Sequence, residues 1–223
     1  MNQANSWYVA RPEFQSKLSV LRQYIDSGQF EFEKANTYQD KRGAMVVDVV
    51  TSRQRKYNPR VLKIVRGWTE SAPTPTLQAL VNNPLDNKEF GLRSGESESI
   101  SNVAAGLLQY GKDFGYTDEN QICLSWATQV EAFRFAPKLD PYVGKVDGMG
   151  IALFAYLRKL SGVNAIKPDV RVRARLSTLG FEVPDGSQAL MMLCEILADE
   201  LDIPRSRFDD YLWAEPMKFE HSE

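Results

Sequence analysis

Apolar residues recur at intervals of three and four along most of this chain, which is the spacing of one face of an α-helix. The first such stretch predicts an amphipathic helix over residues 14–25 that ends near Gly28. Its apolar positions are Phe14, Leu18, Leu21, Tyr24 and Ile25. A valine-rich run over 44–50 has the composition of a strand, yet it continues without a turn residue into helically spaced apolar positions. We therefore interpret 44–66 as a helical region that begins buried.

The same spacing predicts helices over most of the remaining chain. They cover 77–81, 99–110, 118–133, 151–160, 169–179 and 189–201, with a last helix opened by Pro204 and Ser206. Gly111, Gly162 and Gly180 stand where three of them are expected to end, and Thr117 or Asp118 is expected to cap the third. Residues 185–188 resemble a capping box, and 215–223 are expected to fray. The sequence predicts an all-α fold.

The amino-acid composition argues against a membrane protein, an exported protein and a metal-binding protein. Its 43% hydrophobic and 25% charged residues are typical of soluble globular proteins. No apolar run approaches the about 20 residues that span a membrane, and the first residues lack an export pattern. The two cysteines, Cys123 and Cys194, lie in apolar helical patterns and favour buried thiols, while the one histidine, His221, is near the end. We expect a cytoplasmic protein with no membrane partner, metal or cofactor.

Charge is unevenly distributed along a chain whose net charge is only −2. Two stretches are basic, 49–66 and 158–175, and Asp169 is the single acid that they contain. Their cations are Arg53, Arg55, Lys56, Arg60, Lys63 and Arg66 in the first, and Arg158, Lys159, Lys167, Arg171, Arg173 and Arg175 in the second. Such segregation can give one positive face that binds phosphate groups, or simply two solvated helix faces.

A Gly-X-Gly sequence lies between two predicted helical segments. Residues 139–152 indicate a short helix, the apolar closing residue Val146, a turn at Gly148 and Gly150, and a second helix. Glycine permits backbone angles that are barred to other residues, and it has no side chain to block a close approach. Free amides at the start of the second helix can bind a phosphate. A plain tight turn explains the same sequence.

Asp169 follows Pro168 at the position of a helix N-cap. Proline keeps the residue before it extended, so a helix is expected to start just after this point. A carboxylate there accepts backbone N–H bonds and lies in the positive field of the helix dipole, which favours its ionised form. Asp169 is therefore either a candidate catalytic carboxylate or a plain cap.

The order and spacing of the hairpin and of Pro168-Asp169-Val170 resemble the helix-hairpin-helix base-excision DNA glycosylases, the superfamily of endonuclease III and the alkylpurine glycosylases. The resemblance covers most of 45–213. Residues 47–54 look like an early segment that ends in a serine–glutamine stretch. Residues 75–80 and 209–213 are similar to the family's following and closing helices. In the family, a side chain from the early segment fills the gap left by an extruded base, which points to Arg53 or Gln54 here.

Departures from the family pattern restrict the chemistry. The lysine of the lyase-competent members is replaced by Ala152, the proline before the first hairpin glycine by Asp147, and the histidine after the aspartate by Arg171. The four-cysteine iron–sulfur loop is missing. Because Ala152 cannot form a Schiff base, the resemblance implies a monofunctional glycosylase in which Asp169 assists attack by water. Lys145 and Lys167 are interpreted as surface phosphate contacts.

The resemblance also implies an architecture and a partner. A barrel-like helical domain over 43–160 would carry the hairpin, and a second domain would combine 1–42 with 161–223 around a shared cleft. Double-stranded DNA would be bound by a monomer, in the nucleoid if the source is bacterial. Besides the catalytic Asp169, the residues expected at the DNA are Arg53, Gln54, Val146, Gly148, Gly150, Ala152 and Arg171. No metal or organic cofactor would be required.

Two other functions fit the sequence. One is a non-enzymatic DNA-binding protein on the glycosylase scaffold, which Asp147, the missing lysine and the low net charge leave open. It would bind duplex DNA in a salt-dependent manner and be indifferent to Asp169. The other is an all-α interaction domain that meets no nucleic acid, in which Gly148 and Gly150 form only a turn. For the glycosylase, alkylated, oxidised, deaminated and hypermodified bases all fit as the excised base, and both repair and defence fit as its role.

Overall fold

The structure is a computed structural model, and it describes residues 8–27 and 38–214. These residues form helices, turns and loops without a strand, so the all-α prediction is confirmed. The α-helices are α2 (Pro12–Ser27), α3 (Arg42–Thr51), α4 (Leu62–Ser71), α5 (Leu77–Asn82), α6 (Glu96–Phe114), α7 (Glu119–Gln129), α8 (Ile151–Ser161), α9 (Val170–Thr178), α10 (Ser187–Leu201) and α11 (Arg205–Trp213). The predicted frayed tail, 215–223, lies outside the described residues.

The chain divides into two compact units. The central unit comprises residues 35–165, and the terminal unit combines 1–34 with 166–223. The domain boundaries expected from the sequence lie at 42/43 and 160/161. In the structure the first boundary falls earlier, at 34/35, and the second falls later, at 165/166, because the loop that follows α8 belongs to the central unit.

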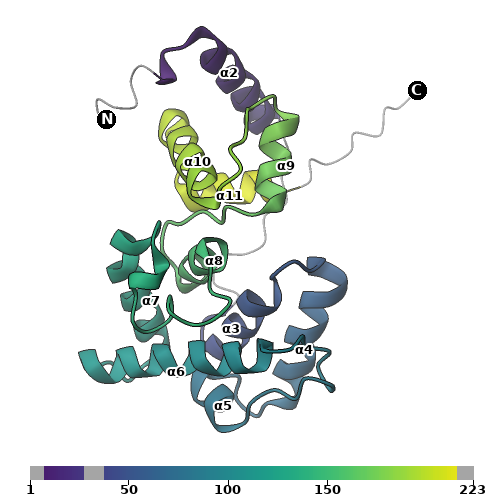
Figure 1. Cartoon of the computed structure of the whole chain (residues 1–223), viewed down its shortest axis with the longest axis vertical. Coiled ribbons are helices and arrows are strands. Elements are labelled where there is room, and N and C mark those ends of the chain that lie inside the picture. The colour runs from purple at the N-terminus through teal and green to yellow at the C-terminus, as the bar shows by residue number, and fades with distance from the viewer. Residues whose placement is uncertain (1–7, 28–37, 215–223) are drawn as a thin grey trace. The chain divides into compact units, whose positions relative to one another are not determined.

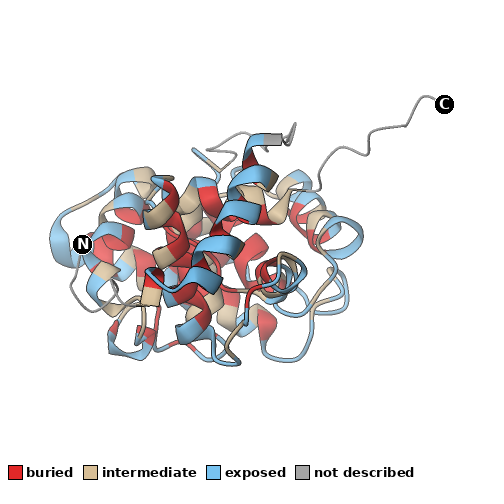
Figure 2. Ribbon diagram, turned by 90° about the horizontal axis from the view of Figure 1, so that it is seen from above, coloured by how far each residue is buried: buried red, intermediate tan, exposed pale blue. Residues whose placement is uncertain are grey.

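Helix α3 is the centre of the central unit. All of its residues are buried, and it contacts α4, α5, α6, α7 and α8 (Figure 1). A helix that is apolar around most of its circumference is stable only when neighbours cover every side, and these five helices provide that cover for the valine-rich run. Buried residues lie where helices face one another, and exposed residues cover their outer faces (Figure 2).

Several predicted helix boundaries are wrong. Helix α6 continues through Gly111 to the left-handed Gly115, because Gly111 marks a close approach to α7 and not an end. A Cβ there would lie 2.5 Å from Cδ1 of Ile122. The predicted helical region 44–66 is interrupted after Thr51 and resumes as a π-helix at Tyr57–Val61, where Pro59 cannot donate a backbone N–H bond.

Two further predictions about helix ends are corrected. Helix α7 begins at its N-cap Asp118 as expected, but it ends at Gln129 and is followed by a 3-10 turn over Val130–Phe133. The capping box predicted over 185–188 does not form. The N-cap of α10 is Gly186, which has no side chain to accept a capping hydrogen bond.

The terminal unit joins the two ends of the chain. Within it α11 contacts both α9 and α10. The hydroxyl of Tyr24 on α2 donates to the carbonyl of Tyr211 on α11, at 3.3 Å, across a separation of 187 positions. The apolar core of the terminal unit includes Leu21, Val172, Leu176, Leu190 and Phe208. The backbone N–H of Lys167 donates to the buried Asp209 carboxylate, which fixes the segment leading into α9.

A buried carboxylate lies inside the apolar core of the central unit. Asp48 on α3 is 0% exposed, and three tyrosine hydroxyls donate to it. The hydroxyls of Tyr38 and Tyr57 lie 2.5 and 2.8 Å from Oδ2, and that of Tyr156 lies 3.3 Å from Oδ1. Burying a carboxylate is costly unless hydrogen bonds replace the lost water. These three donors therefore make Asp48 compatible with the core, and they join α3 to the π-helix and to α8.

This network predicts loss of stability at alkaline pH. Burial and the Asp48 carboxylate raise the pKa of Tyr38 and Tyr156 above the ordinary value of 10.0. Above about pH 10 the unfolded chain loses these protons while the folded chain keeps them, so unfolding is favoured by up to about 1.4 kcal/mol per pH unit for each tyrosine. Urea unfolding between about pH 8 and 11 measures this slope.

The variant Tyr156→Phe keeps the ring and removes one of the titrating hydroxyls. We expect it to be less stable at neutral pH, because Asp48 loses a hydrogen bond, and to show a shallower alkaline slope. A free energy of unfolding that is independent of pH over this range in the wild type contradicts the assigned network.

Candidate functional site

The segment before the hairpin is a turn and not the predicted short helix. Only Pro137–Leu139 are helical, as a single 3-10 turn. The buried Asp140 carboxylate replaces helical hydrogen bonding, because its Oδ2 accepts the backbone N–H groups of Val143 and Gly144 at 3.0 and 2.8 Å. The indole N–H of Trp126 donates to the same oxygen. Asp140 therefore fixes the loop that leads to the hairpin.

The two hairpin glycines differ in conformation. Gly148 has a φ of +85° in the left-handed region, whereas Gly150 has a φ of −92° that any residue adopts. The prediction of unusual backbone angles thus holds for Gly148 alone. Val146 and Met149 are buried on either side and hold the turn against the core. Gly150 is the N-cap of α8, and no side chain caps this helix, so its first amides are left to solvent or to a ligand.

Arg53 lies directly against this turn. A Cβ at Gly148 would approach Nη1 of Arg53 to 2.8 Å, so the missing side chain makes room for the guanidinium. The structure therefore brings together two of the residues expected at the DNA. Ala152, at the family's lysine position, is partly buried in the first turn of α8 and offers no nucleophile.

Gln54, the other predicted gap-filling residue, has a strained backbone. Its φ is +52°, and its side chain is exposed. The guanidinium of Arg93 holds this turn, because its two terminal nitrogens donate to the carbonyls of Arg53 and Gln54 at 2.9 and 3.0 Å. Sequence reasoning missed Arg93, since nothing in the local pattern links it to a turn some forty positions earlier.

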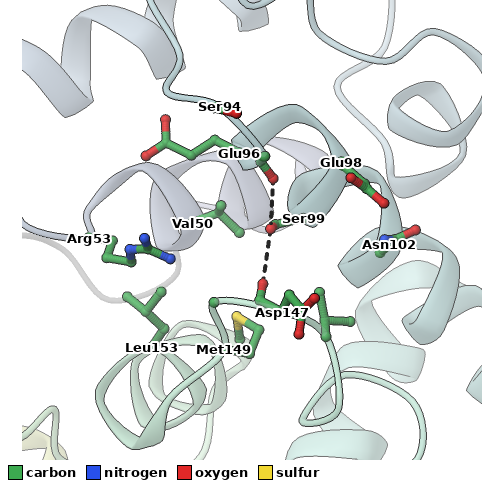
Figure 3. Close-up of a pocket in the computed structure, with 13 residues that line it drawn as sticks. Val50, Arg53, Ser94, Glu96, Glu98, Ser99, Asn102, Asp147, Met149 and Leu153 are labelled. Carbon is green, nitrogen blue, oxygen red and sulfur yellow. Dashed lines mark hydrogen bonds between the residues drawn. The ribbon is translucent and has the colours of Figure 1, made fainter.

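A hollow of about 270 Å³ lies between the end of α3, the start of α6 and the hairpin (Figure 3). The Ser99 hydroxyl lies 2.9 Å from the carbonyl of Gly95 and 3.0 Å from that of Asp147, and so bridges α6 to the hairpin. The hollow is lined by Val50, Arg53, Ser94, Gly95, Glu96, Glu98, Ser99, Asn102, Val146, Asp147, Gly148, Met149 and Leu153. Carboxylates outnumber the single arginine, so the hollow itself does not favour an anion.

Asp169 is the N-cap of α9, as the sequence predicts. Its Oδ1 accepts the backbone N–H groups of Arg171 and Val172 at 2.9 and 3.0 Å. Oδ2 lies 3.7 Å from Nζ of Lys167, and the Asp169 side chain is 15% exposed. The carboxylate is thus fixed by two N–H donors and a neighbouring cation, and one oxygen edge is not used by the cap.

The interpretation of Lys167 as a surface phosphate contact is wrong. This residue is 5% exposed, and its ammonium lies 5.3 Å from the ring centroid of Trp213 as well as near Asp169. Arg171 contacts the same ring, with its Cζ 4.4 Å from the centroid. Trp213 therefore contacts both of the cations that lie near Asp169 in the sequence, a contact that the local sequence pattern does not indicate.

The two basic stretches are only partly available to a ligand. Arg55 forms a buried ion pair with Glu96 at 2.7 Å, and Arg158 is buried against Glu131. Arg173 donates to the carbonyls of Pro184 and Asp185. These cations support the fold, so the positive face predicted from the charge distribution is smaller than the sequence indicates.

The candidate residues belong to both units. Arg53, Gln54, Val146, Gly148, Gly150 and Ala152 are in the central unit, and Asp169 and Arg171 are in the terminal unit. Within the described ranges, no three acidic, cysteine or histidine side chains form a cluster that could hold a metal ion. The thiols of Cys123 and Cys194 are buried, which raises the pKa of both. None of the described helices is long and apolar enough to cross a membrane.

Comparison with family models, with curated proteins and with solved structures finds no match to this chain.

The strain at Gln54 predicts a stabilising substitution. A left-handed backbone costs an ordinary residue about 1–2 kcal/mol, and glycine escapes most of this cost. We expect Gln54→Gly to raise the free energy of unfolding by about 0.5–1 kcal/mol after the greater freedom of the unfolded chain is included. Gln54→Ala is the matched control, because it removes the same side chain and keeps the strain. Equal unfolding free energies for both variants in urea argue against strain at this position.

Proposed function

We propose that this protein is a monofunctional DNA glycosylase that hydrolyses the N-glycosidic bond of a damaged or modified base in double-stranded DNA. The observation that carries the proposal is the fixed carboxylate of Asp169 at the start of α9. The order of hairpin and aspartate, which resembles the helix-hairpin-helix glycosylases, supplies the reaction class. The proposal requires no metal or organic cofactor.

Asp169 has the geometry that this reaction needs. Departure of a base leaves positive charge on the sugar, and a rigid carboxylate stabilises such charge without having to reorganise. Two backbone N–H donors to Oδ1 fix the orientation of Asp169, and the oxygen edge outside the cap can orient or deprotonate an attacking water. Because Ala152 replaces the family's lysine, water and not an amine would attack the sugar.

The hairpin is suited to hold a phosphate of the DNA backbone. The uncapped start of α8 provides backbone amides and the positive end of a helix dipole. The Arg53 guanidinium beside Gly148 adds a cation at the same turn. Such contacts position the duplex without reading its sequence. Asp147, which is exposed at the turn, opposes this binding and is expected to weaken it.

Gln54 is the better candidate for the residue that replaces an extruded base. Arg53 packs against Gly148, whereas the Gln54 side chain is exposed on a strained turn whose carbonyl is held by Arg93. Strained residues persist where the surrounding structure enforces them, often because they present a functional group. Base flipping leaves a gap in the stack, and a presented amide side chain could occupy it.

The experiment that tests the proposal compares Asp169→Asn with Asp118→Asn. Both aspartates are N-caps that accept backbone N–H bonds, so the two substitutions perturb a helix start in the same way. Release of free base from duplex oligonucleotides carrying alkylated, oxidised, deaminated or hypermodified bases is measured at enzyme excess. We expect Asp169→Asn to lower the rate by about 100-fold or more, and Asp118→Asn to leave it nearly unchanged. If the wild type releases no base from the panel, or both variants excise equally, the enzymatic proposal fails.

Gln54→Ala separates base flipping from DNA binding. We expect this variant to bind undamaged duplex within about twofold of the wild type, because phosphate contacts dominate affinity. Its rate of base release is expected to fall, since the flipped state loses the side chain that fills the gap. An undiminished rate in single-turnover assays would reassign this role to another residue, with Arg53→Ala as the first variant to compare.

A non-enzymatic DNA-binding protein on the same scaffold is the second candidate. It is favoured by the engagement of both Asp169 oxygens, since Oδ1 caps α9 and Oδ2 lies near Lys167. In that case Asp169 has only a structural role. Salt-dependent binding of duplex DNA without release of any base, equal in wild type and Asp169→Asn, distinguishes this candidate from the enzyme.

A further inference from the structure

A second hollow lies wholly within the terminal unit, between α9 and the end of α11. Its volume is about 230 Å³, and it is lined by Arg171, Ala174, Arg175, Thr178, Leu212 and Trp213. Arg171 and Arg175 are four positions apart on α9, as are Ala174 and Thr178, so two adjacent rows of side chains face the hollow. The hollow exists because the side chains of Ala174 and Thr178 are small, and the two arginines lie at its border.

Both guanidinium groups are held in place by uncharged groups. Arg171 stacks on Trp213, and Arg175 donates to the Ala214 carbonyl at 3.1 Å while its Cζ lies 5.5 Å from the Tyr24 ring centroid. In the part of the chain that the structure describes, neither arginine pairs with a carboxylate. Five N–H groups extend from each guanidinium, so donors remain for a ligand. Because rings and a carbonyl fix the two side chains in advance, an anion would lose little affinity to ordering them.

We infer that this hollow, the Arg171–Arg175 pocket, binds one phosphate of a DNA backbone. The inference rests on the DNA binding proposed above and adds a contact in the terminal unit. A phosphate presents oxygens that match the fork of donors on a guanidinium, and two guanidiniums can share one group. The contact would position the duplex and carry no sequence information.

Arg173 provides a matched control on the same helix. Its guanidinium donates to the carbonyls of Pro184 and Asp185 at 2.6 and 2.7 Å, and it does not line the pocket. Arg171→Gln, Arg175→Gln and Arg173→Gln all change the net charge by the same amount. A difference between them therefore reports the pocket and not the general field of the protein.

The experiment measures binding of undamaged duplex DNA by the full chain over a range of salt concentrations. Each phosphate contact contributes about 0.9 to the slope of log affinity against log salt. Because the two arginines share one phosphate, we expect Arg171→Gln and Arg175→Gln each to lower the magnitude of the slope by up to about 1 and to weaken binding at least threefold at low salt. For Arg173→Gln we expect the wild-type slope.

A substitution of the pocket floor tests the same inference without removing an arginine. Ala174→Glu places a carboxylate between the two guanidiniums, and Ser177→Glu places one elsewhere on the exposed surface of α9. We expect Ala174→Glu to weaken duplex binding at least fivefold relative to Ser177→Glu. Thermal unfolding of each variant identifies any that fails to fold. If one comparison loses a variant in this way, the other comparison, arginine variants against Arg173→Gln or Ala174→Glu against Ser177→Glu, decides the outcome.

The outcomes separate this inference from the proposed enzyme. If base is released but all three arginine variants share one slope, the pocket inference fails and the glycosylase proposal stands. If the slopes differ as expected and no base is released, the pocket stands and the enzymatic proposal fails. If the wild type does not bind duplex DNA at low salt, both fail.

Discussion

The central unit depends on the burial of one charge-bearing side chain. Asp48 lies in the middle of a helix that has no exposed residue, and its carboxylate is compatible with that position only because tyrosine hydroxyls surround it. The donors come from the segment before α3, from the π-helix and from α8. Removing Asp48 would take from all three hydroxyls the acceptor that they share, so this carboxylate holds the three segments in one arrangement.

The segments that Asp48 holds together are joined directly to the two candidate DNA-binding loops. The strained turn at Gln54 lies between the buried α3 and the π-helix that carries Tyr57, and the hairpin leads directly into the helix that carries Tyr156. Ser99 and Arg93 add hydrogen bonds to the hairpin and to the turn, respectively. Both loops are exposed while their two ends are anchored in the core. Loops positioned by a rigid scaffold are where binding residues are usually found.

Periodicity and capping rules predicted most of the helices, because both depend on neighbouring residues. The N-caps Asp118 and Asp169 and the left-handed Gly162 after α8 follow from such local chemistry. Long-range pairing could not be predicted. Glu96 neutralises Arg55, Glu131 neutralises Arg158, and Lys167 is buried beside Trp213, so sequence overestimated the exposed positive charge. The helix expected before the hairpin failed because Asp140 bonds the backbone itself.

The composition of the terminal unit from both chain ends sets an order of folding during synthesis. Residues 35–165 form a contiguous unit that can fold as soon as they leave the ribosome. Helix α2 precedes this contiguous unit in the sequence and α11 follows it, so Tyr24 cannot meet Tyr211 until all the residues between them have been made. Until then α2 lacks part of its final packing, and apolar surface exposed in this way promotes aggregation of a nascent chain.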